Sequence, residues 1–97
     1  AFAVPDGYML AIRSRSGLAF NHGIHAFHGT VDSDYTGSVK VLLMAEPRDD
    51  ETPPFRINPG DRIAQACLVP VPMVAFEEVD ELPTTERGEA GFGSTGP

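Results

Sequence analysis

Two carboxylates and one aromatic ring are grouped in residues 29–37, which read GTVDSDYTG. A carboxylate beside an open cleft can orient and deprotonate a water molecule, and such general-base assistance contributes about 10²–10⁴ in rate. A turn rich in Asp and Ser before a strand is the plain structural alternative. A turn needs neither Tyr35 nor Gly37 at these offsets, so the whole string favours water activation by one of its carboxylates.

Two other stretches have the residue types of a phosphate site. Residues 14–17 (SRSG) lie where a strand would turn into a short helix, and backbone N–H groups at a helix start attract anions. An ordinary Ser cap with a turn glycine is the alternative here. Residues 60–65 (GDRIAQ) lead into an apolar strand. Their alternative is a hairpin turn with an Asp61–Arg62 surface pair, which contributes little energy.

The third candidate for phosphate binding is the glycine-rich end of the chain. Residues 88–95 (GEAGFGST) nearly match P-loop spacing, but Ser94 stands where that motif requires Lys. Glycine amides such as that of Gly93 can still point at a phosphate, and Arg87 can supply charge. A solvated tail is the alternative, and Phe92 within the glycine run counts against it.

These stretches need short strands to position them. Alternating residues, apolar runs and Gly/Pro punctuation predict a strand with one buried face at 39–43, a core strand at 63–71, and shorter strands at 8–12, 24–27 and 73–79. The only helical candidate is 16–22, which Gly23 would end in a left-handed conformation. Many short strands with regular turn signals predict an all-β barrel or jelly roll.

The chain divides by composition into a β core at 1–82 and an arm at 83–97. The arm has almost nothing to bury, so we expect it to be mobile until a ligand orders it. Residues 46–54 are polar and charged, which predicts a surface loop.

Composition limits the function further. A chain of 97 residues forms one domain at most and, lacking a disulfide framework, would gain stability from oligomerisation. The net charge of −7 argues against a nucleic-acid partner, and no apolar run is long enough to span a membrane. The single Cys67 excludes an intrachain disulfide and suits a cytoplasmic or other reducing intracellular compartment. His25 and His28 would face opposite sides of a strand, so the histidines predict no metal site.

Taken in order, residues 14–19, 29–37, 60–65, 87–88 and 91–96 resemble the motifs of the trimeric dUTPases, which hydrolyse dUTP to dUMP and pyrophosphate. That family's first motif, of the Ala-Gly-x-Asp-Leu type, is absent from these residues. The sequence does not open with Met, so we expect that its start has been removed or is not shown. Residues 23–29 match the hairpin that reads uracil in the family, are about two residues shorter, and contain no Asn.

The resemblance implies an all-β, distorted jelly-roll or β-clip fold and a homotrimer with active sites shared between subunits. It assigns Asp32 as the water-activating base and places Tyr35 under the deoxyribose. Mg²⁺ would be held by the substrate phosphates and water, with no direct protein ligand. The remaining substrate contacts that it implies are the phosphate-binding Arg15, Ser16, Gly17 and Gln65, and the arm residues Arg87, Phe92 (stacked on uracil), Gly93, Ser94 and Thr95.

Two other functions stay open. One is a relative in the same superfamily, a dCTP deaminase or a bifunctional deaminase–diphosphatase, against which Asp32, Tyr35 and the Phe92 arm speak. The other is a catalytically weakened dUTPase-like subunit that binds a nucleotide or a protein partner.

Overall fold

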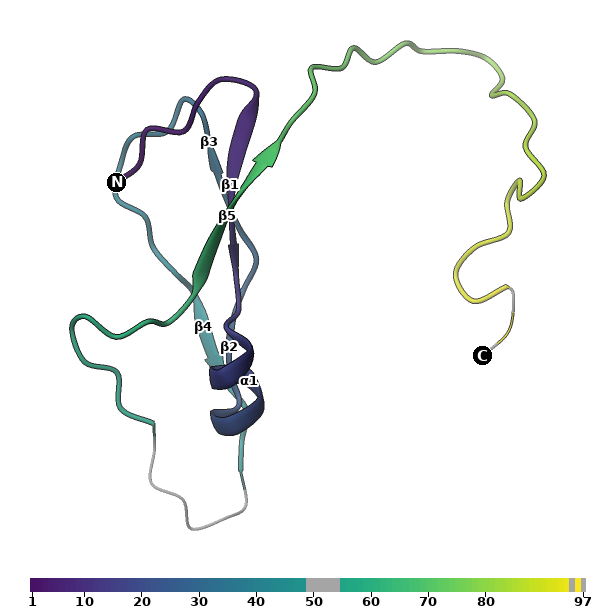
Figure 1. Cartoon of the computed structure of the whole chain (residues 1–97). Coiled ribbons are helices and arrows are strands. Elements are labelled where there is room, and N and C mark those ends of the chain that lie inside the picture. The colour runs from purple at the N-terminus through teal and green to yellow at the C-terminus, as the bar shows by residue number, and fades with distance from the viewer. Residues whose placement is uncertain (49–54, 95, 97) are drawn as a thin grey trace.

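A computed structural model describes residues 1–48, 55–94 and 96. The described residues form one short helix and five strands, and the strands make up two separate sheets (Figure 1). In chain order the elements are β1 (Tyr8–Arg13), α1 (Ser16–His22), β2 (Ile24–Ala26), β3 (Gly29–Asp32), β4 (Leu43–Ala45) and β5 (Gln65–Pro70). The strands predicted at 8–12 and 24–27 and the helix predicted at 16–22 are confirmed.

The larger sheet has the order β3-β1-β5 and is antiparallel throughout. Its central strand β1 carries the buried positions Leu10, Ala11 and Ile12. Val4 and Val31 complete the buried cluster around Leu10 and Ile12. The buried face of β1 sets the register of its two neighbours, β3 and β5. Through these two strands the predicted motifs at 29–37 and 60–65 come to the same sheet.

Helix α1 follows β1 directly. Arg15 is its N-cap residue, in extended conformation, and makes no side-chain capping bond. The structure therefore does not use a Ser cap. Gly23 ends the helix with φ of 65°, a left-handed conformation that costs glycine nothing, and its N–H donates to the Leu18 and Ala19 carbonyls.

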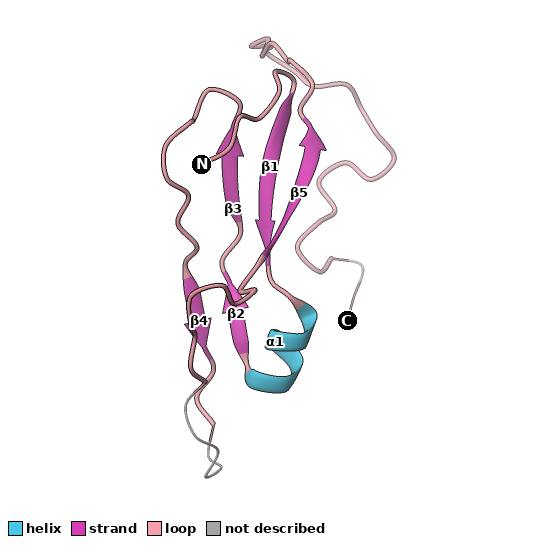
Figure 2. Cartoon of the chain, turned by 60° about the vertical axis from the view of Figure 1, so that its left-hand side comes forward, coloured by secondary structure: helices cyan, strands magenta, loops and turns pink. Residues whose placement is uncertain are grey.

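The smaller sheet pairs β2 with β4, bringing Ile24 opposite Ala45. The stretch 23–29 is therefore not a hairpin, contrary to the expectation from the resemblance. Its strand β2 belongs to one sheet, and the chain passes through Phe27 and His28 into β3 of the other. Figure 2 shows β2 and β4 side by side below the larger sheet, with α1 beside β2.

Three strand predictions need correction, and the first two concern residues 39–43 and 63–71. Val39 and Val41 are half-buried against the core, as their alternation predicted, but no strand forms until β4 begins at Leu43. Strand β5 exists, but it is an edge strand and not a core strand: five of its six residues are exposed, including Leu68 at 53%. The apolar side chains of β5 are therefore mostly not buried within one chain.

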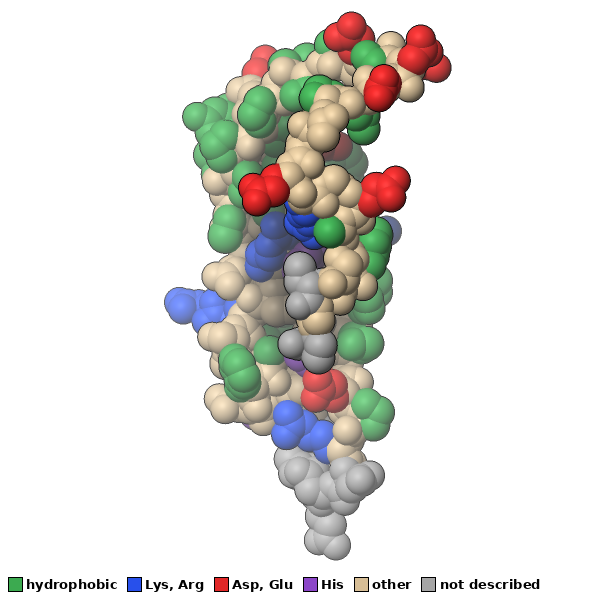
Figure 3. Space-filling view, turned by 90° about the vertical axis from the view of Figure 1, so that its right-hand side faces the viewer, with side chains coloured by type: hydrophobic (Ala, Val, Ile, Leu, Met, Phe, Trp, Pro, Cys, Tyr) green, Lys and Arg blue, Asp and Glu red, His purple; other side chains and the backbone are tan. Residues whose placement is uncertain are grey.

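Beyond β5 the chain leaves the sheet. The Val71 N–H donates to the Gly7 carbonyl over 2.7 Å, and the chain then swings outward in Figure 1. No strand forms at 73–79, where Met73 and Phe76 are 95% and 99% exposed, because no neighbouring strand pairs with this segment. The radius of gyration is 19.6 Å, against about 13 Å for a compact chain of this length. Figure 3 shows hydrophobic side chains on the surface along both flanks of this view.

Among the described residues, no helix has the length and apolar character needed to cross a membrane.

Candidate functional site

Arg15, Ser16, Gly17 and Gln65 line one pocket of about 150 Å³. The register brings them together: Gln65 opens β5 opposite Arg13, and Arg15 follows two residues after Arg13. The Gln65 amide donates from Nε2 to the Ser14 carbonyl over 2.8 Å. The first helical turn holds no acidic residue, so its unpaired N–H groups and the Arg15 guanidinium face no competing negative charge there. Such a pocket suits a phosphate group.

The turn before β5 is held by Asp61. Its carboxylate accepts from the Asn58 N–H over 2.8 Å, and its own N–H donates to the Asn58 carbonyl. The turn, with Arg62, flanks a second cavity of about 490 Å³ that shares Arg15 and Gln65 with the phosphate pocket. The described residues show no ion pair between Asp61 and Arg62, so the Asp here has a structural role in the turn.

Tyr35 lies in a tight turn directly after β3. Its N–H donates to the Asp32 carbonyl over 3.1 Å, and its hydroxyl donates to the Ser38 carbonyl over 2.6 Å. A Cβ at Gly37 would approach the Tyr35 hydroxyl oxygen to 2.6 Å, closer than side chains tolerate. This contact explains why the motif has Gly at position 37 when Tyr stands at position 35.

Beside Tyr35 is a cavity of about 310 Å³. Its lining combines apolar residues with polar ones, and comprises Ile12, Gly29, Thr30, Val31, Tyr35, Ser38, Val39 and Lys40. Sequence reasoning missed Lys40, although it is the only lysine of the chain and follows Tyr35 closely. Cationic side chains are scarce in this sequence, and that scarcity could have marked Lys40 as a candidate.

The Asp32 carboxylate lies away from the phosphate pocket within one chain. Asp32 pairs with Met9 near the start of β1, while Gln65 pairs with Arg13 at its end. Four residues of strand separate the two positions, which is about 13 Å along β1. Asp32 is exposed, and no described residue forms a hydrogen bond or ion pair with its carboxylate. One chain thus presents Asp32 and the pocket of Arg15 and Gln65 on two distinct surfaces.

The predicted arm residues lie apart from both surfaces. The Arg87 guanidinium donates from Nε to the Ala90 carbonyl, and the Gly88 N–H donates to the Thr85 hydroxyl over 3.0 Å. Phe92 is fully exposed and has a φ of 52°, which is uncommon for a residue with a side chain. Gly93 and Ser94 follow it in turns, and Thr95 lies outside the described residues.

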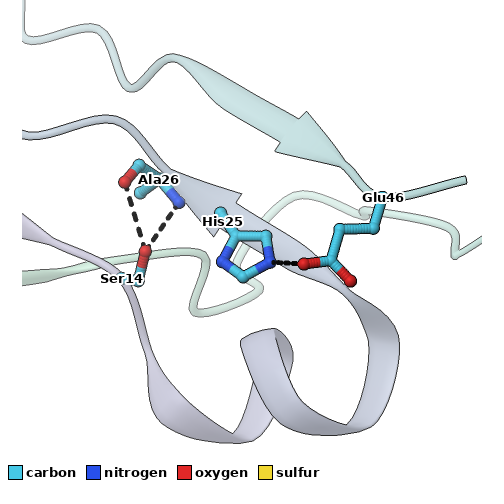
Figure 4. A network of polar contacts seen from close by, with 4 residues as sticks. All are labelled: Ser14, His25, Ala26 and Glu46. Carbon is cyan, nitrogen blue, oxygen red and sulfur yellow. Dashed lines mark hydrogen bonds and ion pairs between the residues drawn. The ribbon is translucent and has the colours of Figure 1, made fainter. Parts of the chain in front are cut away.

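The histidines and the cysteine form no metal centre in the described part of the chain, where no three His, Cys, Asp or Glu residues gather to hold an ion. His25 instead pairs with Glu46, with 2.8 Å between Nε2 and Oε1 (Figure 4). His22 packs against Phe55 with ring centroids 4.6 Å apart. Cys67 is a free, exposed thiol on β5.

Fold and site together describe a small β-protein with a polar, phosphate-sized pocket and a separate cavity beside an aromatic ring. A family model described as dUTPase matches residues 1–96. The chain belongs to the dUTPase family.

Individual relatives agree with this assignment. A deoxyuridine 5'-triphosphate nucleotidohydrolase of Nautilia profundicola is 50% identical over 98 residues, which cover 99% of this chain and 66% of that protein. The protein of the same name from Rhizobium rhizogenes is 52% identical, with 98% of this chain and 60% of the relative covered. The chain thus spans about 60–66% of the length of these curated relatives.

Solved structures show the same fold. A mutant of the dUTPase of Staphylococcus bacteriophage 80alpha, with dUpNHpp, superposes with a TM-score of 0.84 at 27% identity, covering 98% of this chain and 70% of that one. A second structure of this phage dUTPase with the same compound has a TM-score of 0.81 at 26% identity, again covering 98% and 70%. The predicted jelly-roll or β-clip dUTPase fold is confirmed.

Proposed function

We propose that the protein hydrolyses dUTP to dUMP and pyrophosphate. The observation that carries this proposal is the pocket in which Arg15, Ser16 and Gly17 meet Gln65, within a chain of the dUTPase family. Two stretches far apart in sequence, each predicted to bind phosphate, converge there. The relatives that are 50% and 52% identical to this chain over the matched residues are named for the same reaction.

The proposed chemistry starts at Asp32. Its exposed carboxylate orients a water molecule and accepts one of its protons as the water oxygen bonds to the α-phosphorus. The bond between that phosphorus and the oxygen bridging to the β-phosphate breaks, and pyrophosphate leaves. Tyr35 lies three residues from Asp32, beside the cavity of about 310 Å³, so the deoxyribose would occupy this cavity with the ring packed against it.

The phosphate chain would be held by the Arg15 guanidinium, the Ser16 and Gly17 donors and the Gln65 amide. Mg²⁺ is proposed to arrive on the substrate, since this ion keeps much of its water shell and often binds through substrate phosphates, where it neutralises charge. The arm would complete the site with Arg87, Gly93, Ser94 and Thr95 on the phosphates and Phe92 over the base.

The separation of Asp32 from Gln65 supports a site built from several copies of the chain. Asp32 and Gln65 of one chain pair with residues about 13 Å apart along β1, which favours Asp32 of a neighbouring copy as the group that meets a triphosphate bound at Gln65. In the proposed homotrimer one subunit supplies the phosphate pocket, a second Asp32 and Tyr35, and a third the arm.

The test is pyrophosphate release by the complete protein with Mg²⁺, comparing dUTP, dCTP and UTP. We expect dUTP to be turned over fastest. Faster release from dCTP or UTP would overturn the substrate assignment. Ammonia release from dCTP would identify a deaminase of the same superfamily, and tight nucleotide binding without turnover would identify a weakened subunit.

A further inference from the structure

A larger cavity adjoins the phosphate pocket. The phosphate pocket, of about 150 Å³, is lined by Arg15, Ser16, Gly17 and Gln65, and the cavity of about 490 Å³ shares Arg15 and Gln65 with it. The two hollows therefore meet at these two residues. A ligand held between Arg15 and Gln65 can extend from the smaller hollow into the larger one.

The charged side chains of the larger cavity are Arg15, Asp61 and Arg62. Residues 61–66 line it as one continuous stretch, and the rest of its lining, apart from Arg15, is apolar. Two guanidinium groups against one carboxylate make this surface locally cationic, in a chain whose net charge is −7. Such a local excess of positive charge attracts anions.

Arg62 is available to a ligand. It is exposed, and the described residues give its guanidinium neither a hydrogen bond nor an ion pair. The carboxylate of the neighbouring Asp61 is engaged in the turn, where it accepts from the Asn58 N–H over 2.8 Å. A guanidinium is planar and weakly hydrated, and it binds phosphate through two parallel N–H···O bonds. An arginine without a partner beside a phosphate pocket is therefore suited to bind a further phosphate group.

The proposed arrangement of subunits gives the direction of the phosphate chain. The nucleoside lies in the cavity beside Tyr35 of a neighbouring copy, and the α-phosphate meets Asp32 of that copy. Only the phosphates farther along the chain are left to the surface that Arg15 and Gln65 share. The larger cavity adjoins this surface and offers a second cation, Arg62.

We propose that Arg62 binds the terminal phosphate of the substrate and so makes the site selective for a triphosphate over shorter phosphate chains. The inference deepens the proposed function and rests on it for the identity of the nucleotide. Arg15 and Gln65 hold the phosphates nearer the nucleoside, and only a chain long enough to pass them reaches Arg62. The binding energy of this contact is thereby withheld from the shorter ligands.

The test compares Arg62→Gln, which removes the charge, with Arg62→Lys, which keeps it. Arg56→Gln is the matched control, because Arg56 is exposed and lines neither hollow. Calorimetric titrations of the complete protein with inorganic triphosphate and with pyrophosphate are made without Mg²⁺, which would shield the phosphates. In Arg62→Gln we expect triphosphate to bind at least about tenfold more weakly, and pyrophosphate within about twofold of wild type. Arg62→Lys should bind triphosphate more tightly than Arg62→Gln, and the control should match wild type.

The same variants are then titrated with nucleotides in the presence of Mg²⁺. In Arg62→Gln we expect dUpNHpp to bind about tenfold more weakly, while dUMP binds within about twofold of wild type. A merely structural role would weaken the short and the long ligands together, in proportion to lost folding.

Unchanged binding of triphosphate in Arg62→Gln, or equal losses for triphosphate and pyrophosphate, would overturn the proposal. Equal losses in the Gln and Lys variants would overturn it too. A role of Arg62 between copies of the chain would instead appear as a lower mass in light scattering, with the preference for triphosphate over pyrophosphate unchanged. These outcomes differ from a failure of the proposed function, in which wild type itself would release no pyrophosphate from dUTP, while the inorganic ligands would still report on Arg62.

Discussion

At the scale of single residues, the proposed role of Asp32 as the water-activating base can be tested most directly. Asp32→Asn keeps the shape of the side chain and removes the proton acceptor, so turnover of dUTP should fall by about 10²–10⁴. Binding of dUpNHpp should stay near wild type, because the structure places Asp32 away from the phosphate pocket. Pyrophosphate release and calorimetric binding measure the two effects. Asp34→Asn, two residues away in the same turn, is the matched control and should retain turnover; equal losses in both variants would contradict the assignment of the base.

The substitution Gly37→Ala tests how the packing of Tyr35 affects substrate preference. The Cβ of Gly37→Ala would lie 2.6 Å from the Tyr35 hydroxyl oxygen and 2.8 Å from its ring, so the ring must move. Tyr35 is 47% exposed and can turn into solvent, which keeps the stability loss below the roughly 1–3 kcal/mol of an overpacked core. We expect the preference for dUTP over UTP to fall by about tenfold, because the ring no longer bounds the sugar cavity. Competitive turnover assays check this, with Ser38→Ala, which keeps the carbonyl that Tyr35 binds, as the control.

At the scale of elements, the sequence predicted those structures that local signals specify. β1 and α1 were expected within one residue of their observed ends, because apolar periodicity and the C-cap glycine are local features. The pairing of β2 with β4 was not expected, since residues 24 and 45 are joined only by the tertiary fold.

The character of β5 was also misjudged. An apolar run in a sequence predicts that a surface is buried, but it does not indicate whether the burial occurs within one chain or between copies of the chain. For the site, the meeting of Arg15 with Gln65 agrees with the prediction from the motifs, whereas the place of Lys40 in the cavity beside Tyr35 depends on neighbours that spacing does not reveal.

The arm gives a prediction at this scale. Every hydrogen bond that the structure describes for residues 85–96 joins the arm to itself. Deleting residues 86–97 should therefore leave the assembly intact while turnover falls sharply, since an arginine of this type contributes about 10³–10⁵ in phosphoryl-transfer enzymes. Gel filtration with light scattering and a turnover assay measure the two results; wild-type turnover and dUTP affinity after the deletion would show that the arm is only a solvated tail.

The two ends of the arm should act on different ends of the ligand. Phe92→Ala removes a stacking surface, which contributes about 1–3 kcal/mol per base, and should weaken binding of dUMP. Arg87→Ala should instead weaken binding of pyrophosphate. Each variant serves as the control for the other in titrations with both compounds, and identical profiles would contradict separate roles.

At the scale of the whole molecule, the single chain leaves too much apolar surface uncovered. Large apolar side chains on β5 and on the segment after it are exposed, and an open strand edge of this kind invites pairing with another chain. The exposed residues there are Leu68, Val71, Met73, Val74, Phe76, Val79 and Leu82. We expect a homotrimer, and light scattering across a dilution series should give three times the chain mass. A fully active monomer would refute it.

Shared sites make a stronger prediction than mass alone. If Asp32 and the arm of one active site come from different subunits, two inactive variants should complement each other when mixed trimers form. Co-expression of Asp32→Asn with the variant lacking residues 86–97, each with its own affinity tag, would supply such trimers. With random assembly, about a quarter of the sites receive both an intact Asp32 and an intact arm, so about a quarter of wild-type turnover should return. Each variant expressed alone is the control and should stay inactive. A site made within one chain could never regain activity in this way, because every chain in the mixture carries one of the two lesions. Tagged trimers that contain both variants and still release no pyrophosphate would therefore place Asp32 and the arm of each site in the same subunit.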